Sequence, residues 1–305
     1  MTTQISAPIR KMNGLGNEIV VLDLRGLKPT PHLTSEIIHQ IAADPRTHFD
    51  QLMVLHAPEV QETLARLRIY NRDGSTAGAC GNGMRCVVLS AFMDTGQKDQ
   101  LYQTSAGLLS ARFEAPNSIA VNMGEPKFDW QDIPLRDPFE DTTRIELQAG
   151  PIDNPILHSP SVCNIGNPHA VFWVDNVDDY DLGRIGPLME HHPLFPEQAN
   201  ISIAQITSQT SARVRTWERG VGLTRACGSA ACAVAVSGAR IGKLARQSTI
   251  TVPGGDLHIE WNDRNRIVMT GPAELEASGR IVFHPAECDD AKSGSFQVSF
   301  EALDE

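Results

Sequence analysis

The stretch NRDGSTAGACGNGMRCVVLSA at 71–91 aligns without a gap with ERGVGLTRACGSAACAVAVSG at 218–238. Both stretches contain an Ala-Cys-Gly triplet, around Cys80 and Cys227, and the offset of 147 residues between these cysteines holds throughout. Self-similarity at a fixed offset is the mark of a repeated structural unit. The repeat therefore predicts two related domains, each with one cysteine at the same place.

Other landmarks recur in the same order in both halves. A Gly-Asn pair precedes each cysteine and ends at Asn17 or Asn167. A Val-x-x-Gly pattern follows each cysteine at the same distance, since 124 − 80 and 271 − 227 are both 44. Two such domains would place a ligand in the cleft between them. The alternative is that common small residues coincide.

Short apolar segments rich in Val, Ile and aromatic residues predict many strands. They lie at 19–24, 51–57, 64–71, 118–124, 170–176 and 212–220. Helices are fewer, with one expected at 34–43, one with an apolar stripe from Gly83 and one apolar nearly all round from Ala231. This pattern predicts an α+β class. We expect an N-terminal domain at 1–128 and a C-terminal domain at 129–274, with 275–305 returning to the first.

The composition disfavours several classes of function. Acidic residues outnumber basic ones, giving a formal net charge of −11, so nucleic acid is not an expected partner. No apolar run has the length of a membrane span and no signal peptide is evident, so we expect a cytoplasmic protein without membrane association. The six cysteines are expected to be reduced thiols. Without CxxC or HExxH motifs, we predict no metal site, and the pair His191-His192 before Pro193 is interpreted as a loop.

Each repeated Cys-Gly pair stands just before an apolar helical segment. A thiol there meets unpaired backbone N–H groups and the positive helix end, so we expect a lowered pKa for Cys80 and Cys227. The glycine lets a ligand approach the backbone closely. The next residues, Asn82 and Ser229, have side chains that can hydrogen-bond an oxyanion.

Two thiols on opposite sides of a substrate carbon would suit the inversion of a stereocentre. One thiolate removes a proton, and the other group, as a thiol, returns one to the opposite face. Hydrogen bonds at the helix ends would stabilise the intermediate charge. The remaining cysteines are assigned to structure: Cys86, Cys163, Cys232 and Cys288.

For several polar residues the sequence allows two interpretations, one functional and one structural. Asparagines near the motifs could bind a polar ligand or only form turns. The pair Glu218-Arg219 could bind an ammonium and a carboxylate, or form a surface salt bridge. His169 could equally be a satisfied core histidine.

Further distinctive motifs are MNGLGNEIVVLD, FDQL, NIGNPHAVFWVD, VPGGDL and MTGPAE. In these and in the two cysteine motifs, the chain resembles the diaminopimelate epimerase family from about Lys11 to Gly279. The resemblance implies two pseudo-symmetric domains, each a strand-rich, barrel-like sheet around a central helix, with the active site in the cleft between them. It also implies an isomerase that interconverts LL- and meso-2,6-diaminoheptanedioate in lysine and peptidoglycan precursor biosynthesis, without pyridoxal phosphate or any other cofactor, and a homodimer.

The same resemblance implies residue roles. The catalytic pair is Cys80 and Cys227, with Cys80 as the base on the LL form, and His169 and Glu218 tune the two thiols. The asparagines and Arg219 hold the distal amino-acid group, so that a symmetrical pair of thiols acts at only one end of the substrate. The implied substrate contacts are Asn17, Gln51, Asn71, Gly81, Asn82, Asn167, Asn200, Glu218, Arg219, Gly228 and Ser229.

A few positions depart from the family pattern. Asn13 stands where histidine is common, Ser229 replaces threonine but keeps the hydroxyl, and Ala230 replaces glycine. GLTRAC stands where GETLAC is common. No departure removes a reacting group, and Ala is favoured over Gly in a first helical turn. No role is predicted for the tail beyond Gly279.

Three alternatives remain at this stage. Proline racemase or hydroxyproline epimerase would share the two cysteines, but their first motif is typically CGHG and their substrates lack a distal amino-acid group. A non-catalytic binding protein on this scaffold would be expected to lose a cysteine. An isomerase with a single acid-base carboxylate would not need both thiols.

Overall fold

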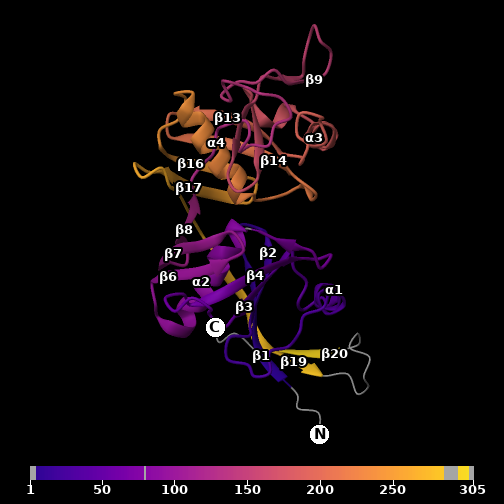
Figure 1. The fold of residues 1–305 in the computed structure, drawn as a ribbon, viewed down its shortest axis with the longest axis vertical. Coiled ribbons are helices and arrows are strands. Elements are labelled where there is room, and N and C mark those ends of the chain that lie inside the picture. The colour runs from indigo at the N-terminus through magenta and orange to yellow at the C-terminus, as the bar shows by residue number, and fades with distance from the viewer. Residues whose placement is uncertain (1–4, 79, 285–294, 302–305) are drawn as a thin grey trace. The chain divides into compact units, whose positions relative to one another are not determined.

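The computed structural model describes residues 5–78, 80–284 and 295–301. The chain forms two compact units, one of residues up to Val121 with those from Pro272 onward, the other of Asn122–Gly271 (Figure 1). The boundaries thus fall slightly before the expected positions, 128 and 274. The first difference arises because the composition changes only after strand β8 has ended at Gly124.

The described residues of the first unit form twelve elements. In chain order they are β1 (Ile5–Asn13), β2 (Glu18–Asp23), α1 (Ser35–Ala43), β3 (Gln51–His56), β4 (Ala65–Asn71), β5 (Thr76–Ala77), α2 (Gly81–Thr95), β6 (Asp99–Thr104), β7 (Gly107–Ala115), β8 (Ser118–Gly124, which runs into the second unit), β19 (Glu274–His284) and β20 (Ser295–Glu301). The late strand β19 pairs antiparallel with β1 and with β20, so the segment after Pro272 extends the sheet of the first unit.

The second unit is built from the intervening elements. They are β9 (Gln148–Ala149), β10 (Leu157–His158), β11 (Ser161–Asn164), β12 (Pro168–Trp173), η1 (Val177–Asp179), α3 (Leu182–Glu190), β13 (Asn200–Ser208), β14 (Ser211–Glu218), β15 (Gly222–Leu223), α4 (Gly228–Arg240), β16 (Gln247–Val252), β17 (Gly255–Trp261) and β18 (Ile267–Gly271). The long segment between β8 and β11 forms only the small β9–β10 pair.

The two units repeat one order of strand pairing. In the first, β2–β3 and β4–β6 are parallel, whereas β3–β4, β6–β7 and β7–β8 are antiparallel. In the second, β12–β13 and β14–β16 are parallel, whereas β13–β14, β16–β17 and β17–β18 are antiparallel. In each unit the long helix follows a short strand, β5 or β15. The predicted α+β fold with two related, strand-rich halves is confirmed.

The helices α2 and α4 are the buried centres of their units. In α4 every residue from Gly228 to Gly238 except Ser229 is buried, as its uniformly apolar sequence predicts. In α2 all residues from Asn82 to Ala91 are buried, so the single apolar stripe expected there is too narrow. Burial on all sides fixes both helices within their sheets, because shifting either one would open cavities.

The helix expected at 34–43 is confirmed as α1, whereas the other helices require two corrections. Both long helices begin earlier than expected, directly after Cys80 and Cys227, because these cysteines adopt the extended backbone of N-cap residues. Helix α3 is missing from the sequence prediction. Its short apolar pattern is interrupted by Gly183, Gly186 and Pro187, and it ends at the histidine pair that was interpreted as a loop. Among the described helices, none has both the length and the apolar character needed to cross a membrane.

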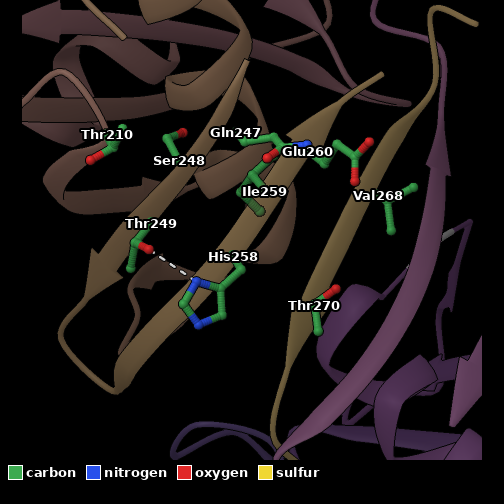
Figure 2. A pocket seen from close by; sticks show the side chains of 9 residues that line it. All are labelled: Thr210, Gln247, Ser248, Thr249, His258, Ile259, Glu260, Val268 and Thr270. Atoms are coloured by element: carbon green, nitrogen blue, oxygen red, sulfur yellow. Dashed lines mark hydrogen bonds between the residues drawn. The ribbon is translucent and has the colours of Figure 1, made fainter. Parts of the chain in front are cut away.

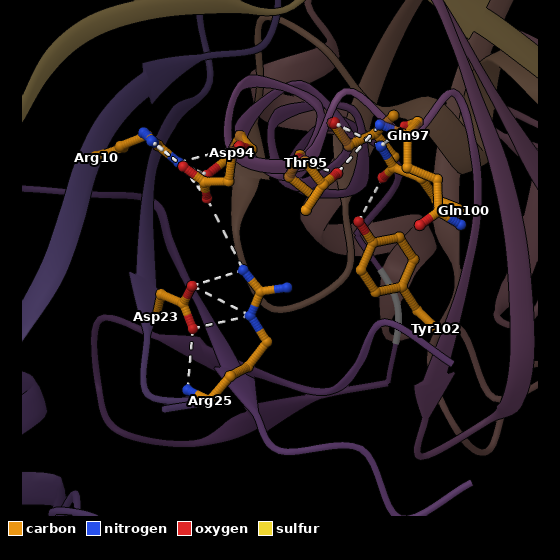
Figure 3. Close-up of polar contacts among 11 residues, drawn as sticks. Arg10, Asp23, Arg25, Asp94, Thr95, Gln97, Gln100 and Tyr102 are labelled. Atoms are coloured by element: carbon orange, nitrogen blue, oxygen red, sulfur yellow. Dashed lines mark hydrogen bonds and ion pairs between the residues drawn. The ribbon is translucent and has the colours of Figure 1, made fainter. Parts of the chain in front are cut away.

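A network of charged residues holds the far end of α2 (Figure 3). Arg10, on β1, donates to both carboxylate oxygens of Asp94 at 3.0 and 2.6 Å and also to the carbonyl and hydroxyl of Ser90. Arg25 lies 3.8 Å from the same carboxylate and is itself paired with Asp23. Since Asp94 contacts two cations, Arg10 on β1 and Arg25 just after β2, it fixes the axis of the helix that begins at Cys80.

Replacing Asp94 by alanine should therefore destabilise the protein. The partly buried Arg10 would lose a bidentate partner, so we expect the free energy of unfolding to fall by about 1–2 kcal/mol in urea denaturation. The matched control is Asp99→Ala, since Asp99 pairs with Arg112 on the surface and is 77% exposed. That change should cost no more than about 0.5 kcal/mol. Equal effects of the two substitutions would contradict the role given to Asp94.

Candidate active site

Cys80 caps the N-terminus of α2 with its thiol. Its Sγ accepts a hydrogen bond from the backbone N–H of Gly83 at 3.2 Å and donates one to Oε1 of Gln51 at 3.5 Å. The residue is half-buried. A sulfur that accepts a backbone N–H at a helix start is in a position that stabilises the thiolate.

Gly83 allows this geometry, and sequence reasoning overlooked it. A Cβ at this position would lie 2.5 Å from Sδ of Met53 and 3.2 Å from Sγ of Cys80. A side chain at this position would therefore require the end of the Met53 side chain to move away from the first turn of α2. The signal was present in the repeated glycines of CGNG, of which only the one next to the cysteine was assigned a role.

The other predicted residues of the first unit gather near this helix start. Gln51 opens β3 and lies directly opposite Asn71, at the end of β4, and the neighbouring β2 starts just after Asn17. Asn82 is buried, and a Cβ on Gly14 would lie 3.2 Å from its Cβ, so the NGLGN loop packs on it. The Oδ1 of Asn17 is buried and has no hydrogen-bond partner among the described residues. These amide side chains therefore lie at the end of the first unit where α2 begins, beside Cys80.

Cys227 occupies the equivalent N-cap position of α4 but is only 6% exposed. Burial, followed by the neighbouring Glu218 carboxylate, raises the pKa of its thiol well above the usual range. The Ser229 hydroxyl, 3.5 Å from Sγ, and the N–H of Ala230 act in the opposite direction. The expectation of a lowered pKa is thus wrong for Cys227, because desolvation outweighs the helix end.

Glu218 ends β14 and lies beside this thiol. Its Oε1 accepts a hydrogen bond of 2.5 Å from the hydroxyl of Thr224, which lies just beyond the short strand β15. Sequence reasoning missed Thr224, since a lone threonine in a turn carries no distinguishing signal. The hydroxyl holds the carboxylate in an orientation near Cys227, where its negative charge opposes formation of the thiolate.

Asn200 and Arg219 are linked through the backbone. The buried Asn200 donates from Nδ2 to the carbonyl of Pro168 at 2.9 Å and accepts the N–H of Arg219 at Oδ1 at 3.0 Å. The Arg219 guanidinium donates to the carbonyl of Glu197 at 2.9 Å. The Asn200 side chain thus joins the start of β12 to the turn after β14.

His169 is a fully buried, neutral histidine. Burial and the Arg219 cation lower its pKa from 6.5 to about 3. Its Nε2 lies 2.8 Å from Oδ1 of Asn167, a carbonyl-type oxygen that only accepts, so Nε2 carries the proton. The Nδ1 atom is then a bare acceptor, and it has no hydrogen-bond partner among the described residues.

Of the cysteines assigned to structure, three are buried as expected: Cys86, Cys163 and Cys232. Burial raises the pKa of Cys86 and of Cys163 to about 12, which keeps both thiols unreactive. Cys288 lies outside the described residues. Within the described ranges, no group of three or more His, Cys, Asp or Glu side chains could hold a metal ion.

A hollow on β16–β18 is separate from these residues (Figure 2). It has a volume of about 370 Å³, and its lining includes His258, whose Nδ1 lies 2.9 Å from the hydroxyl of Thr249. None of its lining residues is a predicted site residue, so we assign it no part in the reaction.

Comparison with known proteins agrees with the sequence motifs. The family described as diaminopimelate epimerase matches residues 9–129 and 161–276. The chain belongs to this family. A diaminopimelate epimerase of Chelativorans sp. is 54% identical over 281 residues, covering 92% of this chain and 94% of the relative. One of Methylobacterium sp. is 57% identical, covering 90% and 94%. The resemblance is thereby confirmed.

Solved structures share the fold at low identity. A phenazine biosynthesis protein of the PhzF family from Enterococcus faecalis superposes with a TM-score of 0.63 at 14% identity, covering 90% of this chain and 99% of that one. A hydroxyproline epimerase from Agrobacterium vitis gives 0.62 at 12% identity, covering 92% and 94%. At such identities the likeness supports the shared architecture alone.

The neutral state of His169 predicts a pH dependence of stability. Below pH 6.5 the unfolded chain binds a proton that the folded His169 excludes until about pH 3. Stability from this group is therefore complete above pH 6.5 and is lost as the pH falls, by roughly 2 kcal/mol at pH 5. His169→Gln should lose less unfolding free energy than wild type between pH 7.5 and 5 in urea titrations. The exposed His158→Gln is the control, and a wild-type slope in the His169 variant would refute the assignment.

Proposed function

We propose that the protein is an amino-acid isomerase that interconverts LL- and meso-2,6-diaminoheptanedioate by proton transfer at one α-carbon. The observation that carries the proposal is the pair of N-cap cysteines, Cys80 and Cys227, at equivalent places in the two halves of a family member. In lysine and peptidoglycan precursor biosynthesis this reaction supplies the meso compound. It uses neither pyridoxal phosphate nor a metal ion.

The two thiols differ in a way that suits opposite roles. The sulfur of Cys80 accepts the N–H of Gly83, which stabilises a thiolate able to remove the α-proton of the LL form. Cys227 is buried beside Glu218 and is held as a thiol, ready to deliver a proton to the opposite face. The proton taken becomes a Cys80 S–H and the proton given leaves a Cys227 thiolate. In the reverse direction the two roles exchange.

The helix starts would stabilise the charge that develops on the substrate. Removing an α-proton delocalises charge onto the neighbouring carboxylate, and backbone N–H groups at a helix N-terminus bind such an anion. These groups are those of Gly81 and Asn82 in one half and Gly228 and Ser229 in the other. The Asn82 amide and the Ser229 hydroxyl add side-chain donors.

The two halves differ at the residues proposed to bind the distal amino-acid group. The repeat matches Asn71 with Glu218 and Arg72 with Arg219. Arg72 forms an ion pair with Asp50 at 2.5 Å. Among the described residues, the Arg219 guanidinium instead donates a hydrogen bond only to the neutral carbonyl of Glu197. The Arg219 guanidinium can therefore bind a substrate carboxylate, and the Glu218 carboxylate can bind the distal ammonium group of the substrate.

The full set of proposed substrate contacts follows the sequence prediction. It comprises Asn17, Gln51, Asn71, Gly81, Asn82, Asn167, Asn200, Glu218, Arg219, Gly228 and Ser229. His169 belongs to the proposal as a neutral hydrogen-bond acceptor that tunes a thiol, since its Nδ1 has no partner among the described residues. Proline or hydroxyproline would leave the Glu218-Arg219 pair without a partner, which favours diaminoheptanedioate.

We also propose that the protein is cytoplasmic and acts as a homodimer. The support is the family resemblance. Sedimentation velocity at micromolar concentration tests the dimer, and a single monomeric species would refute it.

Loss of either thiol should abolish epimerisation. For Cys80→Ala and Cys227→Ala we expect turnover to fall by about a thousandfold or more, because each face of the carbon needs its own acid-base group. The assay follows LL-substrate in deuterium oxide by NMR, where wild type should place solvent deuterium on the inverted carbon. Cys232→Ala, inside α4, is the control and should remain active. Turnover by either single variant at the wild-type rate would exclude the two-base mechanism.

The arginine repeat provides a matched test of specificity. Arg219→Met should raise KM for LL-diaminoheptanedioate by roughly ten- to a hundredfold, because a charge-assisted bond to the distal carboxylate is lost. Arg72→Met removes the corresponding arginine of the other half, which is already paired with Asp50, and should leave KM near the wild-type value. Equal KM increases in steady-state assays would contradict the assignment of the distal group to Arg219.

A further inference from the structure

A buried carboxylate clamps the turn that carries Glu218 and Arg219. Glu190, the last residue of α3, is only 3% exposed. Its Oε2 accepts the indole N–H of Trp217 at 2.6 Å, and its Oε1 accepts the backbone N–H of Gly220 at 2.8 Å. The two contacts flank Glu218 and Arg219 on either side, so one side chain brackets this dipeptide.

The backbone of the turn and Asn200 provide the other constraints on its shape. Between the end of β14 and the start of β15, Gly220 adopts a φ of +73°, which glycine reaches without strain. Three successive N–H groups each go to a different acceptor: Arg219 to Asn200, Gly220 to Glu190, and Val221 to the carbonyl of Glu218. Loss of Glu190 would leave the middle group of this series without its acceptor.

Helix α3 is held against the same turn. A Cβ on Gly186 would lie 2.4 Å from Cγ of Trp217, so the helix backbone packs directly on the indole. Leu182 and Met189 bury the adjacent face of the helix in the core of the second unit. The carboxylate of Glu190 therefore projects from a fixed support.

A carboxylate is a costly choice for a purely structural contact. Both of its hydrogen-bond donors are neutral, and burying a carboxylate among such partners carries a desolvation penalty. The exposed His191 imidazole lies at the limit of an ion pair, with Nδ1 4.0 Å from Oε2. Within the part of the first unit that the structure describes, the matching turn has no such clamp: Asp73 accepts the N–H and hydroxyl of Ser75, and Asn71 donates its N–H to the carbonyl of Ser75. The clamp thus belongs to the half that we propose selects the distal end of the substrate.

We infer that Glu190 is a positioning residue that holds Glu218 and Arg219 in the orientation in which they receive the distal amino-acid group. This inference rests on the proposed function of those two residues. A carboxyl group offers two acceptor oxygens that bind both N–H groups at once, which an amide or a hydroxyl at this position would not reproduce.

The test compares Glu190→Gln and Glu190→Ala with Leu188→Ala, a control on the same helix at a residue that is 72% exposed. We expect KM for LL-diaminoheptanedioate to rise about tenfold or more in both Glu190 variants, with less change in kcat. Gln keeps one acceptor and should recover part of the loss seen with Ala. Wild-type KM in a folded Glu190→Ala protein, or a fall in kcat and melting temperature with KM unchanged, would overturn the inference.

A second readout does not depend on turnover. In a Cys80→Ala background, the pH dependence of Cys227 alkylation, followed by site-resolved mass spectrometry, reports the distance of the Glu218 charge. If Glu190 holds Glu218 in place, the midpoint should move to lower pH in Glu190→Ala. An unchanged midpoint overturns the inference even if the proposed substrate proves wrong. If Glu190→Ala fails to fold, Trp217→Phe removes one of the two bonds, and a wild-type KM and midpoint there would overturn it.

Discussion

The burial of a helix start is the constraint on which both halves of this molecule depend. The first N–H groups of a helix have no hydrogen-bond partners within the helix, and a helix start that is buried in a sheet has little water to bind them. A cysteine is the N-cap residue of both α2 and α4. The buried helices that form the centres of the two units therefore also fix the positions of the two sulfur atoms, at the helix starts. The charged network around Asp94 secures the other end of α2, which links the stability of the first unit to the position of Cys80.

Within this repeated frame, the chemistry comes from the differences between the halves. Cys80 is half-buried and accepts a backbone N–H, whereas Cys227 is buried beside a carboxylate that opposes its ionisation. Asp50 neutralises Arg72, but the matching Arg219 keeps its charge and lowers the pKa of His169. A small number of charged residues thus makes the two repeated units chemically different. The carboxylate of Glu190 is a further difference, and it belongs to the unit that contains Glu218.

The sequence predicted what depends on local pattern and repetition. The alignment around Cys80 and Cys227 predicted two related units, and the apolar pattern located α4 and the strands β2, β3, β4, β8, β12 and β14. It failed where the outcome depends on tertiary surroundings. Desolvation raised the pKa of Cys227 against the helix end, and packing on Trp217 stabilised α3 despite Pro187. Thr224 and Glu190 carry no motif, because their roles arise only when distant segments meet.

Ala230 shows how the repeat explains a departure from the family pattern. Its counterpart Gly83 has no room for a Cβ, because Sδ of Met53 would lie 2.5 Å away. Met53 is the third residue of β3, and the third residue of β13 is the much smaller Ser202, whose hydroxyl lies 3.0 Å from that of Thr216. A large strand residue thus accompanies glycine in the first helix turn of one unit, and a small strand residue accompanies alanine in the other. The N–H of Ala230 still lowers the pKa of the Cys227 thiol, so the added methyl group leaves this influence of the helix start on the sulfur in place.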